Sequence, residues 1–127
     1  MAKVPYGISN FKDLITQEYI YMDKTKYIEI LESYGEKYIF FLRPRRFGKS
    51  LFVSTLEHYY DCNNQDDFND LFGDLYIGNK PTNLANSYYV LSFDFSGINT
   101  ATKSDLLEGF TQNVREGLDE FIDKYNL

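Results

Sequence analysis

The chain has 127 residues, 43% of them hydrophobic, which is enough for the core of one domain and excludes a disordered composition. A formal net charge of −6 argues against a generally basic nucleic-acid-binding protein. The single cysteine excludes an internal disulfide and fits a reducing, cytoplasmic location, and no apolar run is long enough to predict a membrane span.

Residues 1–35 are predicted to form a helical lead. After a turn-rich entry, a short helix is expected over residues 11–19. A second helix is expected over residues 25–34, with Asp23 as a plausible N-cap and Gly35 as its end. The apolar face of this second helix is marked by Tyr27, Ile28, Ile30, Leu31 and Tyr34.

Residues 36–60 are predicted to form a strand, a loop and a helix. The run Tyr38 to Leu42 is apolar and rich in β-forming residues, and it is bounded by Gly35 and Pro44. Helical spacing of apolar residues then continues to about Tyr60. Residues 61–87 are expected to be a short helix followed by a loop.

Residues 88–127 are predicted to contain a second strand and a long helix. The segment Tyr88 to Phe95 is apolar almost throughout, which is typical of a strand buried on both faces of a parallel sheet. From about Lys103 to Tyr125, apolar residues form one helical stripe, and the acidic residues off that stripe are expected to face solvent. The order strand–helix–strand–helix predicts an α/β fold with a parallel sheet and flanking helices.

The tripeptide Gly48-Lys49-Ser50 stands between the first predicted strand and its helix, as in a phosphate-binding P-loop. In such a loop the backbone N–H groups of Phe47 to Leu51 would surround an anion, Lys49 would neutralise the terminal phosphates, and Ser50 would ligate Mg²⁺. Arg43 occupies the place of the pattern's first glycine. The alternative is structural: Gly48 ends a turn and Ser50 caps the helix, with no nucleotide bound.

Three blocks of the chain resemble the AAA-ATPase-like family of bacterial proteins. The most specific block is the arginine-rich loop 43–51. The blocks Pro5 to Phe11 with Tyr21 to Thr25, and Leu71 to Ile77, agree with the family's order, although Met22 stands where valine is usual. The resemblance implies a P-loop NTPase-type fold that binds ATP and Mg²⁺, and it makes an arginine at position 43 the family's normal state.

The resemblance covers only the N-terminal portion of the family's ATPase domain. It implies that a Walker B strand, sensor elements and a PD-(D/E)XK nuclease-like domain would follow beyond residue 127. The fold expected for residues 1–127 is therefore an incomplete parallel sheet, and any nuclease function would belong to a domain outside it.

Three further groups of residues invite a functional interpretation. Asp94, at the end of the second predicted strand, could organise Mg²⁺ or could form a turn, and Phe95 stands where a catalytic glutamate would be expected. The box Asp23 to Thr25 could approach the nucleotide or cap a helix. Arg45 and Arg46 could contact phosphate or pair with acidic residues elsewhere.

The sequence thus predicts nucleotide binding with little or no hydrolysis, and it identifies no catalytic residue. The expected metal ligands are Ser50 and Asp94, and the expected nucleotide contacts are Arg43, Arg45, Arg46, Phe47, Gly48, Lys49, Ser50 and Leu51. The alternative is a non-catalytic module that self-associates through exposed sheet edges. Direct DNA binding through the three arginines is a weaker possibility, because the overall charge opposes it.

Overall fold

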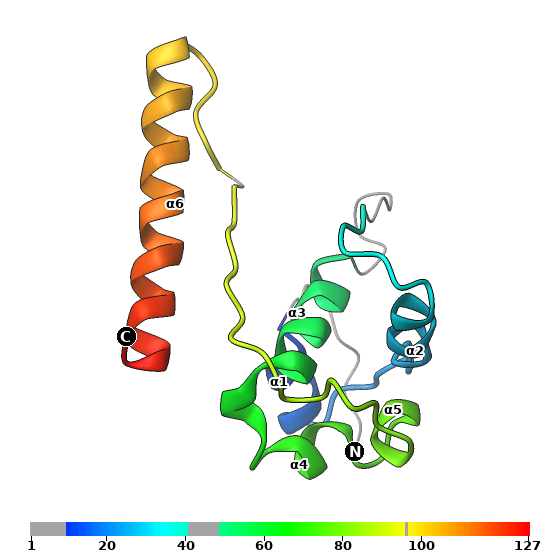
Figure 1. Ribbon diagram of the computed structural model, residues 1–127. Helices are drawn as coiled ribbons and strands as arrows, with labels where there is room; N and C mark the ends of the chain where they lie inside the picture. Colours follow the sequence, from blue (N-terminus) through cyan, green and yellow to red (C-terminus); the bar gives the residue numbers. More distant parts are fainter. Residues whose placement is uncertain (1–9, 41–48, 96) are drawn as a thin grey trace. The chain divides into compact units, whose positions relative to one another are not determined.

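The computed structural model describes residues 10–40, 49–95 and 97–127, and the chain divides into two compact units, the first ending at Tyr88 and the second spanning Tyr89–Leu127. Figure 1 shows the elements in chain order. The helices of the first unit are α1 (Phe11–Thr16), α2 (Lys26–Ser33), α3 (Lys49–Tyr60), the 3-10 helix η1 (Cys62–Asn64), α4 (Phe68–Phe72) and α5 (Tyr76–Asn79). The second unit contains α6 (Lys103–Tyr125).

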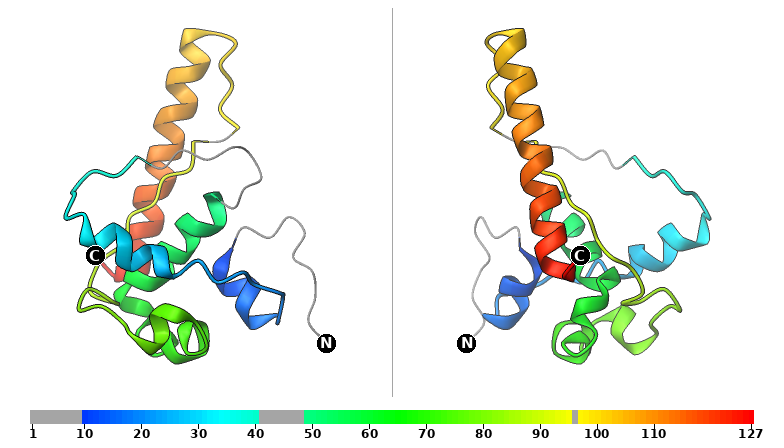
Figure 2. Two further views of the ribbon diagram at one scale, coloured as in Figure 1. Left: turned by 90° about the vertical axis from the view of Figure 1, so that its right-hand side faces the viewer. Right: turned by 60° about the vertical axis from the view of Figure 1, so that its left-hand side comes forward.

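The first unit is built around a core of aromatic and aliphatic side chains. Phe11 of α1 stacks on Phe72 of α4 with ring centroids 4.8 Å apart, and Tyr59 of α3 meets Phe72 edge-on at 5.5 Å. Both arrangements are favourable for aromatic rings, whose faces and edges carry opposite partial charge. The fully or almost fully buried core residues are Phe11, Ile28, Tyr59, Leu71, Phe72 and Ile77. In both views of Figure 2, α3 lies between α1 and α2.

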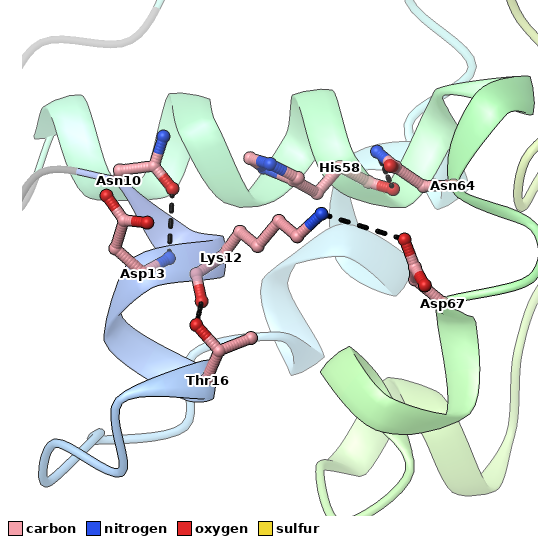
Figure 3. A network of polar contacts seen from close by, with 7 residues as sticks. All are labelled: Asn10, Lys12, Asp13, Thr16, His58, Asn64 and Asp67. Carbon is pink, nitrogen blue, oxygen red and sulfur yellow. Dashed lines mark hydrogen bonds and ion pairs between the residues drawn. The ribbon is translucent and has the colours of Figure 1, made fainter.

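Polar contacts cap the start of α1 and join this helix to the loop before α4 (Figure 3). The side chain of Asn10 caps α1 by accepting from the backbone N–H of Asp13 at 3.0 Å. The ammonium of Lys12 lies 3.7 Å from the carboxylate of Asp67, in the loop before α4. Because both side chains are about half exposed, this ion pair contributes little to stability, and the apolar core is the main source of cohesion.

The second unit consists of α6 and an extended segment that runs antiparallel along it (Figure 1). Tyr89 packs on Tyr125 near the end of α6, with centroids 4.6 Å apart, and Phe95 stacks on Phe110 near its start at 5.2 Å. The segment approaches closely at Gly117, where an added Cβ would lie 2.6 Å from Cδ1 of Phe93. A glycine at this position lets the aromatic segment lie against the helix backbone.

Helix α6 confirms the long helix that the sequence predicts from Lys103 to Tyr125. Thr102 caps its start by accepting from the backbone N–H of Asp105 at 3.0 Å. Asn126 ends it in the left-handed conformation, with φ 57°, and asparagine is one of the few residues other than glycine that tolerate this conformation.

The predicted α/β fold with a parallel sheet is wrong for the described residues, which contain helices and no sheet. Asp61 and Tyr88 form an isolated parallel bridge. The second predicted strand has no strand partner: Tyr89 and Phe95 pack on α6, and Leu91, Phe93 and Phe95 remain 40 to 45% exposed instead of buried on both faces. A strand forms only where a neighbour pairs with its backbone, and apolar composition alone does not supply that neighbour.

The first predicted strand is likewise not formed in its described part. Tyr38 and Phe40 are 92% and 87% exposed, and residues 41 and 42 lie outside the described residues. The described part of the chain contains no sheet, and it therefore contains none of the exposed sheet edges that were predicted to mediate self-association.

Candidate functional site

The predicted phosphate site is described only from its helical side. Helix α3 begins at Lys49, so the Gly-Lys-Ser motif does lead into a helix, as a P-loop requires. Ser50 is exposed in the first turn of α3, and Leu51 packs against the core. Arg43, Arg45, Arg46, Phe47 and Gly48 lie outside the described residues, as does the side chain of Lys49.

The middle of α3 is held by α1 and by its own backbone. Ser54 is buried, and its hydroxyl oxygen accepts from the backbone N–H of Phe11 at 2.9 Å. The hydroxyl of Thr55 donates to the carbonyl of Leu51 at 2.8 Å. The helix that begins at the candidate site is therefore tied to the helical lead about halfway along its length.

The C-terminal end of α3 carries a connected hydrogen-bond network of four residues, which we call the α3 clamp: Glu32, Tyr59, Tyr60 and Thr82. The carboxylate of Glu32 accepts from the hydroxyl of Tyr60 at 2.8 Å and from that of Thr82 at 2.9 Å. The Thr82 hydroxyl donates its single proton to Glu32. In its 2.8 Å contact with the Tyr59 hydroxyl, Thr82 is therefore the acceptor and Tyr59 the donor. The Tyr59 oxygen in turn accepts from the backbone N–H of Thr82 at 2.9 Å.

The α3 clamp joins α2, the end of α3 and the loop after α5, and sequence reasoning missed it. Its members are separated by up to 50 residues, and no motif or spacing marks them. Partial burial, followed by the hydrogen bond to Glu32 and its negative charge, raises the pKa of the Tyr60 hydroxyl well above its usual range. The hydroxyl therefore remains a proton donor to Glu32 at the alkaline pH at which an ordinary tyrosine ionises.

The box Asp23 to Thr25 has a structural role in the first unit. Asp23 accepts from the backbone N–H of Thr25 at 2.9 Å and, through its other oxygen, from that of Tyr76 at 2.7 Å. The hydroxyl of the fully buried Thr25 donates to Asp23 at 2.6 Å and accepts from the backbone N–H of Ile77 at 3.2 Å. The box thus holds the first turn of α5 as well as the start of α2. The N-cap of α2 is Thr25 and no side chain caps this helix, so the predicted N-cap role of Asp23 is wrong; Asp23 and Thr25 instead accept from the first backbone N–H groups of α5. The approach of the box to a nucleotide stays a prediction.

Asp94 belongs to the second unit, where its side chain is exposed and its backbone carbonyl accepts from the amide of Asn113 at 2.8 Å. Its role as a metal ligand stays a prediction. Among the residues that the structure describes, no group of three or more histidine, cysteine or acidic side chains could hold a metal ion.

The histidine of α3, His58, has a structural contact within its own helix. Its Nδ1 lies 2.8 Å from the backbone carbonyl of Ser54, so this ring nitrogen is the donor.

Comparison with known proteins identifies the family. A family described as predicted AAA-ATPase matches residues 5–127. The chain belongs to this family. This confirms the resemblance carried by the arginine-rich loop and by the two other blocks.

A curated relative from Azotobacter chroococcum mcd 1, described as an uncharacterized protein in the vnfD 5′ region, is 44% identical over 62 residues. The match covers 48% of this chain but 12% of that relative, so the chain spans a small part of the relative's length. No solved structure matches the chain. In the described part of the chain, no helix combines the length and the apolar character that crossing a bilayer requires.

Proposed function

We propose that this chain binds ATP with Mg²⁺ through a variant Walker A loop. The observation that supports this most directly is the start of α3 at Lys49, within the Gly-Lys-Ser motif, in a chain that belongs to the predicted AAA-ATPase family. A helix start at this point directs free backbone N–H groups and the positive end of the helix dipole toward the loop.

Each predicted residue has a physical role in this proposal. Lys49 places a mobile positive charge on the β and γ phosphates, and the exposed hydroxyl of Ser50 ligates Mg²⁺. The backbone amides of Phe47 to Leu51 surround phosphate oxygens. The three arginines of the loop, Arg43, Arg45 and Arg46, add local positive charge that attracts a compact anion to an otherwise acidic chain.

We expect binding to be weak and turnover to be negligible. Efficient hydrolysis also needs an aspartate that organises Mg²⁺ and a group that orients the attacking water. Asp94 is the proposed candidate for the first role, and the sequence supplies no candidate for the second. The chain is therefore proposed as a nucleotide-binding part of an ATPase.

The test is calorimetric titration of ATP with Mg²⁺ into the wild-type chain and into Lys49→Ala. The matched control is Lys26→Ala, which removes an exposed lysine from the first turn of a different helix, α2. We expect Lys49→Ala to abolish binding and Lys26→Ala to preserve it. Equal binding by all three proteins would refute the assignment of Lys49, and absence of binding by the wild type would refute the function.

A second candidate function, self-association without catalysis, rests on the surface of the second unit. Its helix exposes large apolar side chains: Leu107, Phe110, Leu118 and Ile122 are 41 to 65% exposed. Apolar residues gathered on one helix are common where proteins associate. Sedimentation velocity at about 100 µM tests this, and a monomer at that concentration would exclude it.

A further inference from the structure

Beside the apolar packing of Leu51 and Phe52, two sets of polar side-chain contacts hold helix α3, and the candidate phosphate site lies N-terminal to both. One is Ser54, whose buried hydroxyl accepts from the backbone of α1. The other is the C-terminal end, where Tyr59 and Tyr60 enter the α3 clamp. The helix is continuous over its 12 residues from Lys49 to Tyr60, so a movement at one end is transmitted to the other.

The lengths of the two arms determine how large that movement is. Five residues separate Ser54 from Lys49 and six separate it from Tyr60. At about 1.5 Å per residue these arms are ~7.5 Å and ~9 Å long. If Ser54 acts as the pivot, a sideways shift of about 1 Å at the clamp moves the first turn of α3 by about 0.8 Å.

The proton arrangement of the α3 clamp favours one geometry. Each hydroxyl proton has a single acceptor, and Glu32 receives two of them. Removal of one hydroxyl therefore breaks a bond and leaves the remaining donors to rearrange. The network resists small shifts of the α3 end more strongly than apolar contacts alone, because hydrogen bonds depend on both distance and angle.

We propose that the α3 clamp is a positioning device for the phosphate site: it sets the direction of α3 and thereby the placement of Lys49 and Ser50 on the phosphates and Mg²⁺. The inference rests on the proposed nucleotide binding. The four residues of the α3 clamp act through the helix and touch no ligand. A displacement of nearly 1 Å at the first turn is enough to weaken contacts with phosphate oxygens substantially.

The test compares the affinity for ATP with Mg²⁺ among single variants, by calorimetry at 10 °C and under conditions in which urea unfolding shows each variant to be folded. Tyr60→Phe deletes one half-buried hydroxyl and keeps the ring, and Thr82→Val deletes the central hydroxyl. Thr82→Ser retains that hydroxyl and serves as the rescue variant. The matched control is Tyr76→Phe, which breaks another tyrosine–glutamate bond of the first unit, to Glu29 at 3.2 Å, on a different helix.

We expect Tyr60→Phe and Thr82→Val to raise the Kd by about tenfold, and Thr82→Ser and Tyr76→Phe to stay within about twofold of the wild type. If Tyr60→Phe is folded but binds ATP like the wild type, the clamp only stabilises the fold and the inference is overturned, whether or not Thr82→Val folds. An equal loss in Tyr76→Phe would overturn it as well. If the wild type binds no ATP, the proposed function itself fails, and the positioning role fails with it.

Discussion

Substitution of Thr25 by valine should destabilise the first unit strongly, although the two side chains have nearly the same shape. Thr25 is fully buried, and its hydroxyl serves two partners, donating to Asp23 at 2.6 Å and accepting from the backbone N–H of Ile77 at 3.2 Å. Valine fills the same space and offers neither interaction. The backbone N–H of residue 25 keeps its own bond to Asp23.

The magnitude follows from the two groups that lose a partner. The N–H of the fully buried Ile77 would be left without an acceptor, which costs about 1–3 kcal/mol. The bond from a hydroxyl to a carboxylate contributes about 1.5–3 kcal/mol, and we take the lower end because Asp23 is exposed. The expected loss for Thr25→Val is therefore about 3 kcal/mol. Thr25→Ser keeps the hydroxyl and loses one methyl group, about 1 kcal/mol.

Urea unfolding followed by circular dichroism measures the difference. With a slope near 1.5 kcal/mol per M, Thr25→Val should lower the unfolding midpoint by about 2 M and Thr25→Ser by less than about 1 M. A Thr25→Val midpoint equal to that of the wild type, or a larger loss in Thr25→Ser, would refute the assignment of these two hydrogen bonds to Thr25.

Three further predictions concern α6 and the α3 clamp. Gly117→Ala places a Cβ 2.6 Å from Cδ1 of Phe93 and 2.8 Å from the backbone oxygen of Ser92, so the clash should exceed the gain in helix propensity and destabilise the second unit by about 1–2 kcal/mol in urea. Gly109→Ala should cost less, because its nearest contact is a side-chain atom, Cγ2 of the β-branched Ile98 at 2.9 Å, and a small shift of that residue relieves it. Thr102→Ala removes the N-cap of α6 and should cost about 1 kcal/mol by the same assay, whereas an unchanged midpoint would argue against the cap. The raised pKa of Tyr60 predicts alkaline sensitivity: above pH ~10 the unfolded chain releases this proton while the folded chain keeps it, so stability falls as pH rises, and Tyr60→Phe should flatten that decline in pH-dependent unfolding.

The sequence alone was sufficient for features that depend on neighbours a few residues away. The helical stripe from Lys103 to Tyr125 matches α6. An amphipathic helix forms its backbone hydrogen bonds within its own segment, and the spacing of its apolar residues indicates which face packs against the rest of the protein. The start of a helix within the Gly-Lys-Ser motif was predicted for the same reason. The family followed from short blocks of residues, because such blocks can be recognised without any knowledge of the fold.

Pairing between distant segments required the tertiary structure. The apolar segment from Tyr88 to Phe95 has the composition of a buried strand, yet no strand forms there, because a strand also needs a partner and its own residues do not specify one. From Tyr89 onward the segment packs on α6 instead. The α3 clamp and the contacts of Thr25 with α5 join residues tens of positions apart and carry no local signal. The sequence therefore predicted which residues would bind phosphate, and the fold determined what holds the helix that carries Lys49 and Ser50, since long-range hydrogen bonds exist only once the chain has brought their partners together.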